Sequence, residues 1–137
     1  MKNNLFKVSI TLMILMLFWG LSTTKICAAS ENGFVYEIIN DEAIITGYDG
    51  VKSGDLEIPS TLGGKPVTAI GDNAFYTCYD FTGSLEIPES VTSIGNCAFY
   101  GCDGFTGTLE IPNSVKSIGQ NSFWGCDSLE SITFKGT

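Results

Sequence analysis

The chain has 137 residues, with 15 acidic residues, seven lysines, no arginine and no histidine, and its formal net charge at pH 7 is −8. The missing histidine excludes the Ser-His and Cys-His pairs on which many hydrolases depend, and an acidic chain without arginine repels nucleic acid and anionic lipid. The composition therefore predicts a protein that is not an enzyme of this kind and has no nucleic-acid partner.

Residues 1–29 are predicted to be a secretory signal peptide. Lys2 and Lys7 precede an apolar run, Val8–Leu21, which is shorter than the ~20 residues that span a bilayer and suits the hydrophobic region of a signal. The small residues Ala28 and Ala29 predict cleavage after Ala29, and the alternative is an uncleaved N-terminal anchor. Cleavage would leave four lysines against 15 carboxylates, a net charge of 4 − 15 = −11, in a secreted or surface-exposed chain without a membrane span.

Residues 30–55 are predicted to form an N-terminal β-hairpin. Two β-rich runs, "GFVYEIIN" and "AIITGYDG", are joined by a polar turn at Asp41 and Glu42. A hairpin in this position would cover the open end of a repeat structure, which exposes apolar surface unless it is capped.

Residues 56–137 contain three copies of one motif and part of a fourth. The copies begin at Leu56, Leu85 and Leu109 with "LEIP", and "ITFKGT" begins the fourth. The second and third copies start 24 residues apart, and the first is longer by the turn-rich insertion "STLGGKP". A period of this length with leucine and isoleucine in register is typical of leucine-rich repeats, in which stacked coils bury one another's apolar faces.

Each copy is predicted to form one coil of a β-rich solenoid. The three "LEI" segments, at 56–58, 85–87 and 109–111, read as short strands of one parallel sheet that end at prolines. A second extended piece follows at 67–70, 91–94 and 115–118, and a glycine then turns the chain. The segment "DNAFYTC" and its copies are predicted to form a short helical or 3₁₀ turn, with Asp72 or Asn96 available as its cap.

Equivalent apolar residues of successive coils are predicted to stack as ladders in the interior. The ladders are Leu56, Leu85, Leu109 and Ile132; Ile58, Ile87, Ile111 and Phe134; Val67, Val91 and Val115; Ile70, Ile94 and Ile118; and Phe75, Phe99 and Phe123. No coil buries its own apolar face, so the motif has to be repeated for the chain to fold.

The repeated segment "IPESVTSIGNCAFYGC" resembles the BspA-like, or Treponema pallidum-type, leucine-rich repeat, whose pattern is roughly I-P-x-x-V-x-x-I-G-x-x-A-F-x-x-C. The resemblance covers Phe34–Thr137, with small departures at Thr77, Cys97 and Ser122. It implies a secreted or surface-exposed bacterial protein of binding or adhesion type, with no catalytic residues to carry over.

Four cysteines follow the predicted signal peptide, and their spacing leaves their state open. Cys78, Cys102 and Cys126 occupy one repeat position, which predicts a ladder of buried thiols. Two disulfides that include Cys97 remain the alternative. The cysteines lack the closely spaced pairs of a zinc site, and we expect neither a metal nor another cofactor.

An acidic row is the first candidate for a binding site. Glu57, Glu86 and Glu110 alternate with the inward leucines, so they are predicted to face solvent, either as a solvated surface or as a docking site for a basic protein. The residues next to this row are Ser84, Thr108 and Thr133. A second candidate is the aromatic row Tyr76, Tyr100 and Trp124, which is either packed between coils or exposed for protein contact.

The leading functional hypothesis is a protein-binding or adhesion module without catalysis. The alternative is a structural one, in which the chain is a truncated segment of a larger surface protein or associates with itself through an uncapped C-terminal end.

Overall fold

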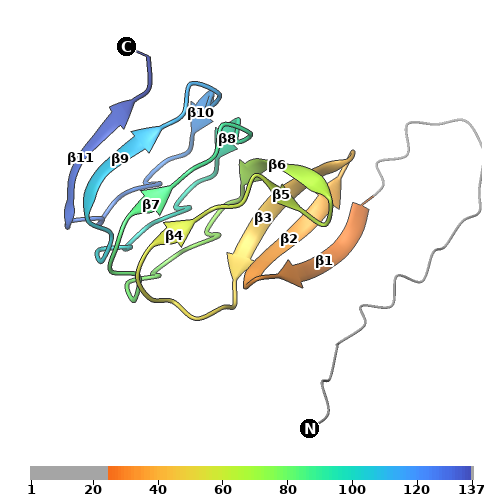
Figure 1. Cartoon of the computed structure of the whole chain (residues 1–137), viewed down its shortest axis with the longest axis horizontal. Helices are drawn as coiled ribbons and strands as arrows, with labels where there is room; N and C mark the ends of the chain where they lie inside the picture. Colours follow the sequence, from red (N-terminus) through yellow and green to blue (C-terminus); the bar gives the residue numbers. More distant parts are fainter. Residues whose placement is uncertain (1–24, 137) are drawn as a thin grey trace, which may run out of the picture.

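The computed structural model describes residues 25–136, so that most of the predicted signal peptide lies outside the described residues. Within this range the chain forms a solenoid of short strands joined by turns, and it contains no helix (Figure 1). The strands are β1 (Lys25–Glu31), β2 (Phe34–Ile39), β3 (Glu42–Tyr48), β4 (Leu56–Glu57), β5 (Thr61–Leu62), β6 (Lys65–Ile70), β7 (Leu85–Glu86), β8 (Ser93–Ile94), β9 (Gly107–Ile111), β10 (Ser117–Ile118) and β11 (Leu129–Phe134).

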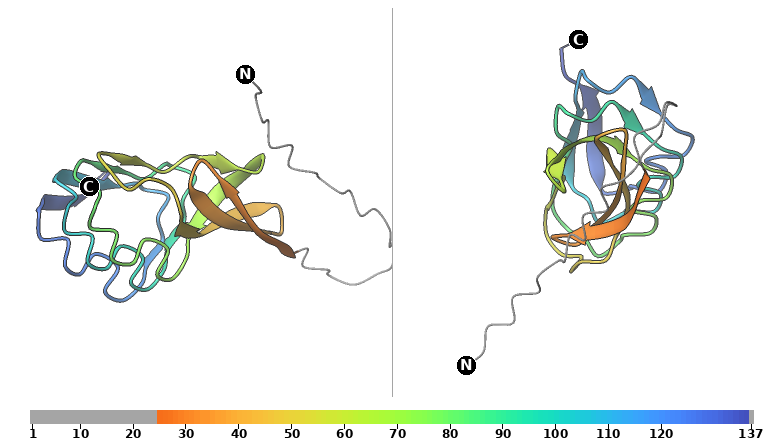
Figure 2. Two further views of the ribbon diagram at one scale, coloured as in Figure 1. Left: turned by 90° about the horizontal axis from the view of Figure 1, so that it is seen from below. Right: turned by 90° about the vertical axis from the view of Figure 1, so that its right-hand side faces the viewer.

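The first three strands cover one end of the solenoid (Figure 2). β2 and β3 form the antiparallel hairpin that the sequence predicts, and Asn40 and Asp41 take left-handed conformations at its turn. β3 then pairs in parallel with β6, which joins the hairpin to the first coil. The outer strand β1 begins at Lys25. Residues 25–29 were predicted to belong to the signal peptide, but they are part of this strand, which pairs with β2.

One side of the solenoid is a continuous parallel ladder. β6 pairs with β8 and β8 with β10, so that Ile70, Ile94 and Ile118 lie in register as predicted. The insertion in the first coil folds into a small hairpin of β5 and β6, which turns at Gly63 and Gly64 with φ angles of 57° and 73°. The extra residues therefore project from the first coil and leave its register with the second intact.

The opposite side departs from the prediction of one parallel sheet. β4 pairs with β7 and β9 pairs with β11, both in parallel, but among the described strands no pairing joins β7 to β9. The two coils are still connected just before the strands, where the Thr106 N–H donates to the Gly83 carbonyl at 2.9 Å. The ladder opens from that point onward.

The opening has a local cause in the glycines that precede these strands. Gly54 and Gly107 are left-handed, with φ angles of 67° and 75°, whereas the equivalent Gly83 is not. Next to Gly83, the Asp55 carboxylate accepts hydrogen bonds from the Ser84 N–H at 2.6 Å and from the Ser84 hydroxyl at 2.9 Å. β7 is thereby held to β4 while β9 follows a different course.

The predicted helical or 3₁₀ turn is wrong, because the segment after each glycine is a run of β-turns. Asn73 and Thr77 are left-handed, with φ angles of 58° and 55°, and a left-handed residue interrupts a right-handed helix. Alternate N–H groups bond within the turn, as from Tyr76 to Asn73, while those between them bond to the next coil, as from Phe75 to Ala98. Each turn thus adds a further hydrogen-bonded side to the solenoid.

Asp72 and Asn96 accordingly link coils instead of capping helices. The Asp72 carboxylate accepts from the Asn96 N–H at 2.7 Å, and the Asn96 side-chain oxygen accepts from the Gln120 N–H at 2.8 Å. The repeated polar position therefore satisfies a backbone donor of the following coil in each case.

The core consists of the predicted ladders and one that the prediction missed. The rings of Phe75, Phe99 and Phe123 stack with centroid separations of 5.0 and 5.3 Å. Phe81 and Phe105 form a second stack at 5.5 Å, and Leu129 occupies the equivalent position of the next coil. In the last described coil Ile118, Ile132 and Phe134 are exposed, so the ladders lose their burial there.

Candidate functional site

The acidic row lies on the outer side of the strands, as the alternation predicts. Leu85 and Leu109 are buried, whereas Glu86 and Glu110 are exposed. Glu57 is the strand partner of Glu86 in one strand pair, and Glu110 is the strand partner of Thr133 in the other. We call the surface of Glu57, Ser84, Glu86, Thr108, Glu110 and Thr133 the acidic face.

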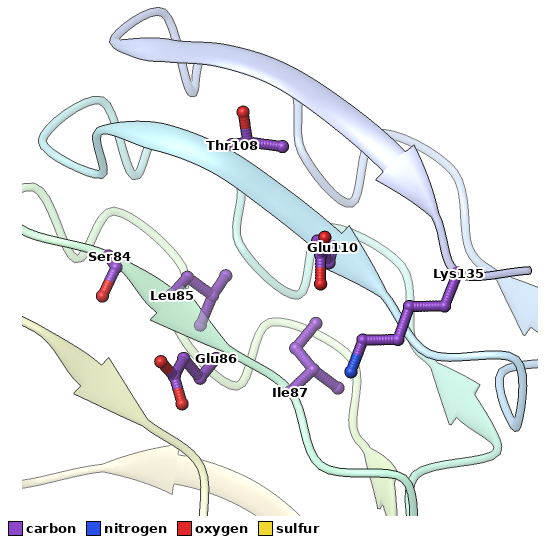
Figure 3. A pocket seen from close by; sticks show the side chains of 7 residues that line it. All are labelled: Ser84, Leu85, Glu86, Ile87, Thr108, Glu110 and Lys135. Atoms are coloured by element: carbon purple, nitrogen blue, oxygen red, sulfur yellow. The ribbon is translucent and has the colours of Figure 1, made fainter.

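The acidic face is divided by a notch where β7 and β9 separate. The notch is a cavity of about 260 Å³ (Figure 3). Four of the six predicted residues line it, whereas Glu57 and Thr133 lie on the flanking strands outside it. The full lining is Ser84, Leu85, Glu86, Ile87, Thr108, Glu110 and Lys135.

Lys135 is the lining residue that the sequence analysis did not identify. It follows β11 in the incomplete fourth copy of the motif, at the position that proline occupies in the other copies, so the repeat gave no sign of a charge there. Its ammonium group is 3.2 Å from a Glu89 carboxylate oxygen, and both side chains are partly exposed. The notch thus combines two carboxylates and one ammonium group, and a third carboxylate, that of Glu89, forms a salt bridge with this ammonium group beside it.

The hydroxyl groups of the acidic face take part in hydrogen bonds between coils. The Ser84 hydroxyl and N–H donate to Asp55, and these bonds hold the pKa of the Asp55 carboxyl below its usual value. The Thr108 and Ser131 hydroxyls lie 2.9 Å apart and share a hydrogen bond across β9 and β11. These contacts fix the positions of two polar side chains at the rim of the notch.

The aromatic row combines the two alternatives left open by the sequence. Tyr76 stacks on Tyr100 with centroids 5.0 Å apart, and Tyr100 stacks on Trp124 at 4.8 Å. Yet Tyr76 and Trp124 remain 47% and 61% exposed. The rings therefore stabilise contact between coils and also present their edges to solvent.

The three repeated cysteines are buried free thiols, as the ladder predicts. The Cys102 thiol donates to the Phe75 carbonyl at 3.0 Å, and the Cys126 thiol donates to the Phe99 carbonyl at 3.2 Å. Burial raises the pKa of Cys102 to about 12 and that of Cys126 to about 11, because the thiolate would lose its hydration. Of Cys78, Cys97, Cys102 and Cys126, Cys97 alone is partly exposed.

Thiol labelling of the folded protein at pH 8 is expected to modify Cys97 and to spare Cys78, Cys102 and Cys126. The buried sulfurs are inaccessible, and burial raises the pKa of all three so that the reactive thiolate is scarce. Mass spectrometry of iodoacetamide-treated protein, with a urea-denatured sample as the control, would measure this. Rapid native modification of Cys102 would contradict the buried ladder.

Two features are absent from the described residues. No group of three or more histidine, cysteine, aspartate or glutamate side chains is arranged to hold a metal ion there. Within the same residues, no helix has the length and hydropathy needed to cross a membrane.

Comparison with known proteins places the chain among bacterial repeat proteins. The family model described as "BspA type Leucine rich repeat region (6 copies)" matches residues 56–137. A leucine-rich cell surface protein of Faecalibacterium prausnitzii A2-165 is 30% identical, with a TM-score of 0.63, over 78% of this chain and 32% of its own. A leucine-rich repeat protein of Bacteroides capillosus ATCC 29799 is 26% identical, with a TM-score of 0.58, over 80% of this chain and 99% of its own.

The chain thus spans about a third of the length of the Faecalibacterium protein and nearly all of the Bacteroides protein. No curated protein matches the chain.

Proposed function

Since the chain belongs to the BspA-type leucine-rich repeat family, we propose that it is a secreted or cell-surface binding module that holds a basic protein partner on its acidic face. The observation that carries the proposal is the notch, which gathers four of the six candidate residues around one cavity. A similar protein is described as a leucine-rich cell surface protein, which supports the location.

Charge supports a basic partner. The chain carries 15 carboxylates and no arginine, so long-range attraction favours positively charged ligands and disfavours acidic ones. The exposed glutamates lie on strands that are fixed by hydrogen bonds between coils, so little order has to be gained on binding. Such a surface suits recognition of a folded protein or an extended basic segment.

Changing Glu57, Glu86 and Glu110 together to glutamine is expected to weaken binding of the partner while leaving the fold intact. The shape is kept and three exposed charges are removed, so stability should hold or rise slightly as repulsion along the row is relieved. Binding to immobilised host-matrix and cell-wall fractions, measured from low to high salt, tests this, because exposed charges are screened over about 10 Å at 0.1 M salt.

Binding that survives the triple change at low salt would place the partner elsewhere. The aromatic row would then be tested, with Trp124→Ala first, because tryptophan is enriched among the residues that anchor interfaces.

Self-association is a second candidate function, favoured by the last described coil. Ile118, Ile132 and Phe134 are 39%, 41% and 54% exposed there. A second copy or a further coil placed on this end would bury them, as the other coils bury one another. Sedimentation of the purified protein distinguishes the two candidate functions. Self-association predicts an oligomer, whereas the binding-module function requires only a monomer.

A further inference from the structure

We propose that the notch between β7 and β9 is a socket for one arginine side chain of the protein partner. This inference rests on the proposed function and narrows it, because it assigns most of the recognition to one position on the acidic face. The neighbouring glutamate Glu57, outside the notch, then contributes only long-range attraction.

The size of the notch favours a single side chain. Its volume of about 260 Å³ lies below the range of about 300–1,000 Å³ that is typical of pockets for small molecules. The notch forms where no strand pairing joins β7 to β9, so its position is set by the backbone, while the exposed side chains of Glu86, Glu110 and Lys135 shape its walls. A protruding side chain can enter such a site without rearranging the partner's backbone.

The lining matches both parts of an arginine side chain. Leu85 and Ile87 are buried core residues that also border the notch, and they offer apolar contact to the aliphatic stem. Glu86 of β7 and Glu110 of β9 border the notch from the two separated strands, and in Figure 3 the exposed Glu86 carboxylate lies on the side of β7 that faces β4. Thr108 also borders the notch, but its hydroxyl group is hydrogen-bonded to that of Ser131 on β11 at 2.9 Å.

These acceptors favour arginine over lysine. A guanidinium group is planar, carries five N–H donors and is weakly hydrated, so it can bond carboxylates on different sides at a small desolvation cost. A lysine ammonium is a compact, strongly hydrated charge that gains less from acceptors spread over two strands. Glu86 and Glu110 lie on different strands, and this separation is the feature that favours an arginine over a lysine side chain.

Lys135 lies on the border of the socket and opposes a bound cation. Its ammonium group forms a salt bridge with Glu89 at 3.2 Å, and Glu89 is not part of the lining. The salt bridge with Glu89 partly offsets the positive charge of Lys135, so a bound cation meets less repulsion from it. Removing the Lys135 charge should strengthen binding of an arginine side chain, and removing the Glu89 charge should weaken it.

The test is an NMR titration of the purified protein with the peptide acetyl-Gly-Arg-Gly-amide at low salt. Chemical shifts are expected to move at residues 84–87 and 108–110 more than at Glu57 or Thr133. The lysine peptide should bind more weakly, and the citrulline peptide, which is uncharged but of similar shape, should not bind measurably. Loss of one charge-assisted hydrogen bond corresponds to about a tenfold loss of affinity or more.

Matched variants test which residues of the acidic face bind the arginine side chain. Glu110→Gln and Glu86→Gln are expected to lower affinity for the arginine peptide about tenfold, whereas Glu57→Gln, which removes the same charge outside the notch, should change it less than about twofold. Lys135→Gln should raise affinity. Because all four side chains are exposed, the NMR spectrum of each variant serves as the check that the fold is retained.

The outcomes separate the socket from the proposed function. Equal losses from Glu57→Gln and Glu110→Gln, or equal binding of the arginine and lysine peptides, would overturn the socket and leave the acidic face as a diffuse binding surface. Absence of any shift around the notch would overturn the socket as well. The proposed function falls separately, if the triple glutamine variant still binds the basic partner at low salt.

Discussion

Replacing Phe99 by alanine is expected to lower the free energy of unfolding by about 3–5 kcal/mol, a large share of the roughly 5–15 kcal/mol that stabilises a domain of this size. Phe99 is fully buried, with its ring between those of Phe75 and Phe123 and edge-on to Phe105 at 6.4 Å. Its removal leaves a cavity and also breaks both stacked contacts of the middle coil, so that two interfaces are weakened at once. Urea denaturation followed by circular dichroism would measure the loss.

Phe123→Ala is the matched control for this change. Phe123 belongs to the same stack, but it is only partly buried and has a described ring on one side only. Its replacement should therefore cost clearly less than that of Phe99. Equal costs would show that stability does not depend on contacts between neighbouring coils in the way that stacked repeats require.

Replacing Gly95 by alanine is expected to destabilise the protein by roughly 3 kcal/mol or more, because no space exists for a methyl group. A Cβ atom at this position would lie 2.5 Å from the Asp72 nitrogen and 2.7 Å from the Gly71 carbonyl carbon, both of which are backbone atoms of the preceding coil. Backbone at the centre of a ladder cannot move aside without breaking hydrogen bonds such as that from the Gly95 N–H to Ile70, at 2.8 Å.

Gly47→Ala provides the comparison on the same fold. A Cβ atom at Gly47 would meet its nearest neighbour, the Val35 Cβ, at 3.7 Å, which is an ordinary contact. This change is expected to be neutral or to stabilise the protein by up to about 1 kcal/mol, because alanine restricts the unfolded chain more than glycine does. Thermal unfolding of the two variants side by side would measure the contrast, and a tolerated Gly95→Ala would show that the coils can move apart at this position.

The glycines that recur every 24 residues illustrate which parts of the fold the sequence predicts and which it does not. The 24-residue recurrence locates Gly71, Gly95 and Gly119 and assigns them to turns, but it does not reveal that Gly95 is required because the preceding coil lies so close. Most inward and outward positions of the strands were predicted correctly, although Ile118, Ile132 and Phe134, which were assigned to the interior, are exposed. The correct predictions follow from strict alternation of apolar and charged residues, which depends on strand geometry alone.

Other features depended on backbone conformation that residue types do not determine. Gly54, Gly83 and Gly107 are identical in sequence, yet Gly83 differs in conformation, so the separation of β7 from β9 was not predictable from the repeat. The turns could have been recognised in part. Asn73 and Asn121 are asparagines at the left-handed positions, where asparagine is common, whereas Thr77 and Cys97 give no such signal.

The candidate site was predicted in its residues but not in its shape. Alternation along the strands identified Glu86 and Glu110, but the notch between them requires knowledge of which strands fail to pair. Lys135 aligns with Pro59, Pro88 and Pro112 of the other copies, which carry no charge, so the repeat did not single it out as a site residue. The stack of Phe81 and Phe105, by contrast, shows the same 24-residue spacing as the other ladders and was available from the sequence.

The position of Trp124 provides the protein with an intrinsic optical probe. It is the one tryptophan among the described residues, and its indole ring is 4.8 Å from the ring of Tyr100 in the neighbouring coil. Tyrosine emission overlaps indole absorption, so excitation of Tyr100 passes to Trp124 as long as the two coils remain in contact. Tryptophan emission that is excited through tyrosine therefore decreases when the last described coil frays. This signal distinguishes fraying from unfolding of the whole chain, without an added label.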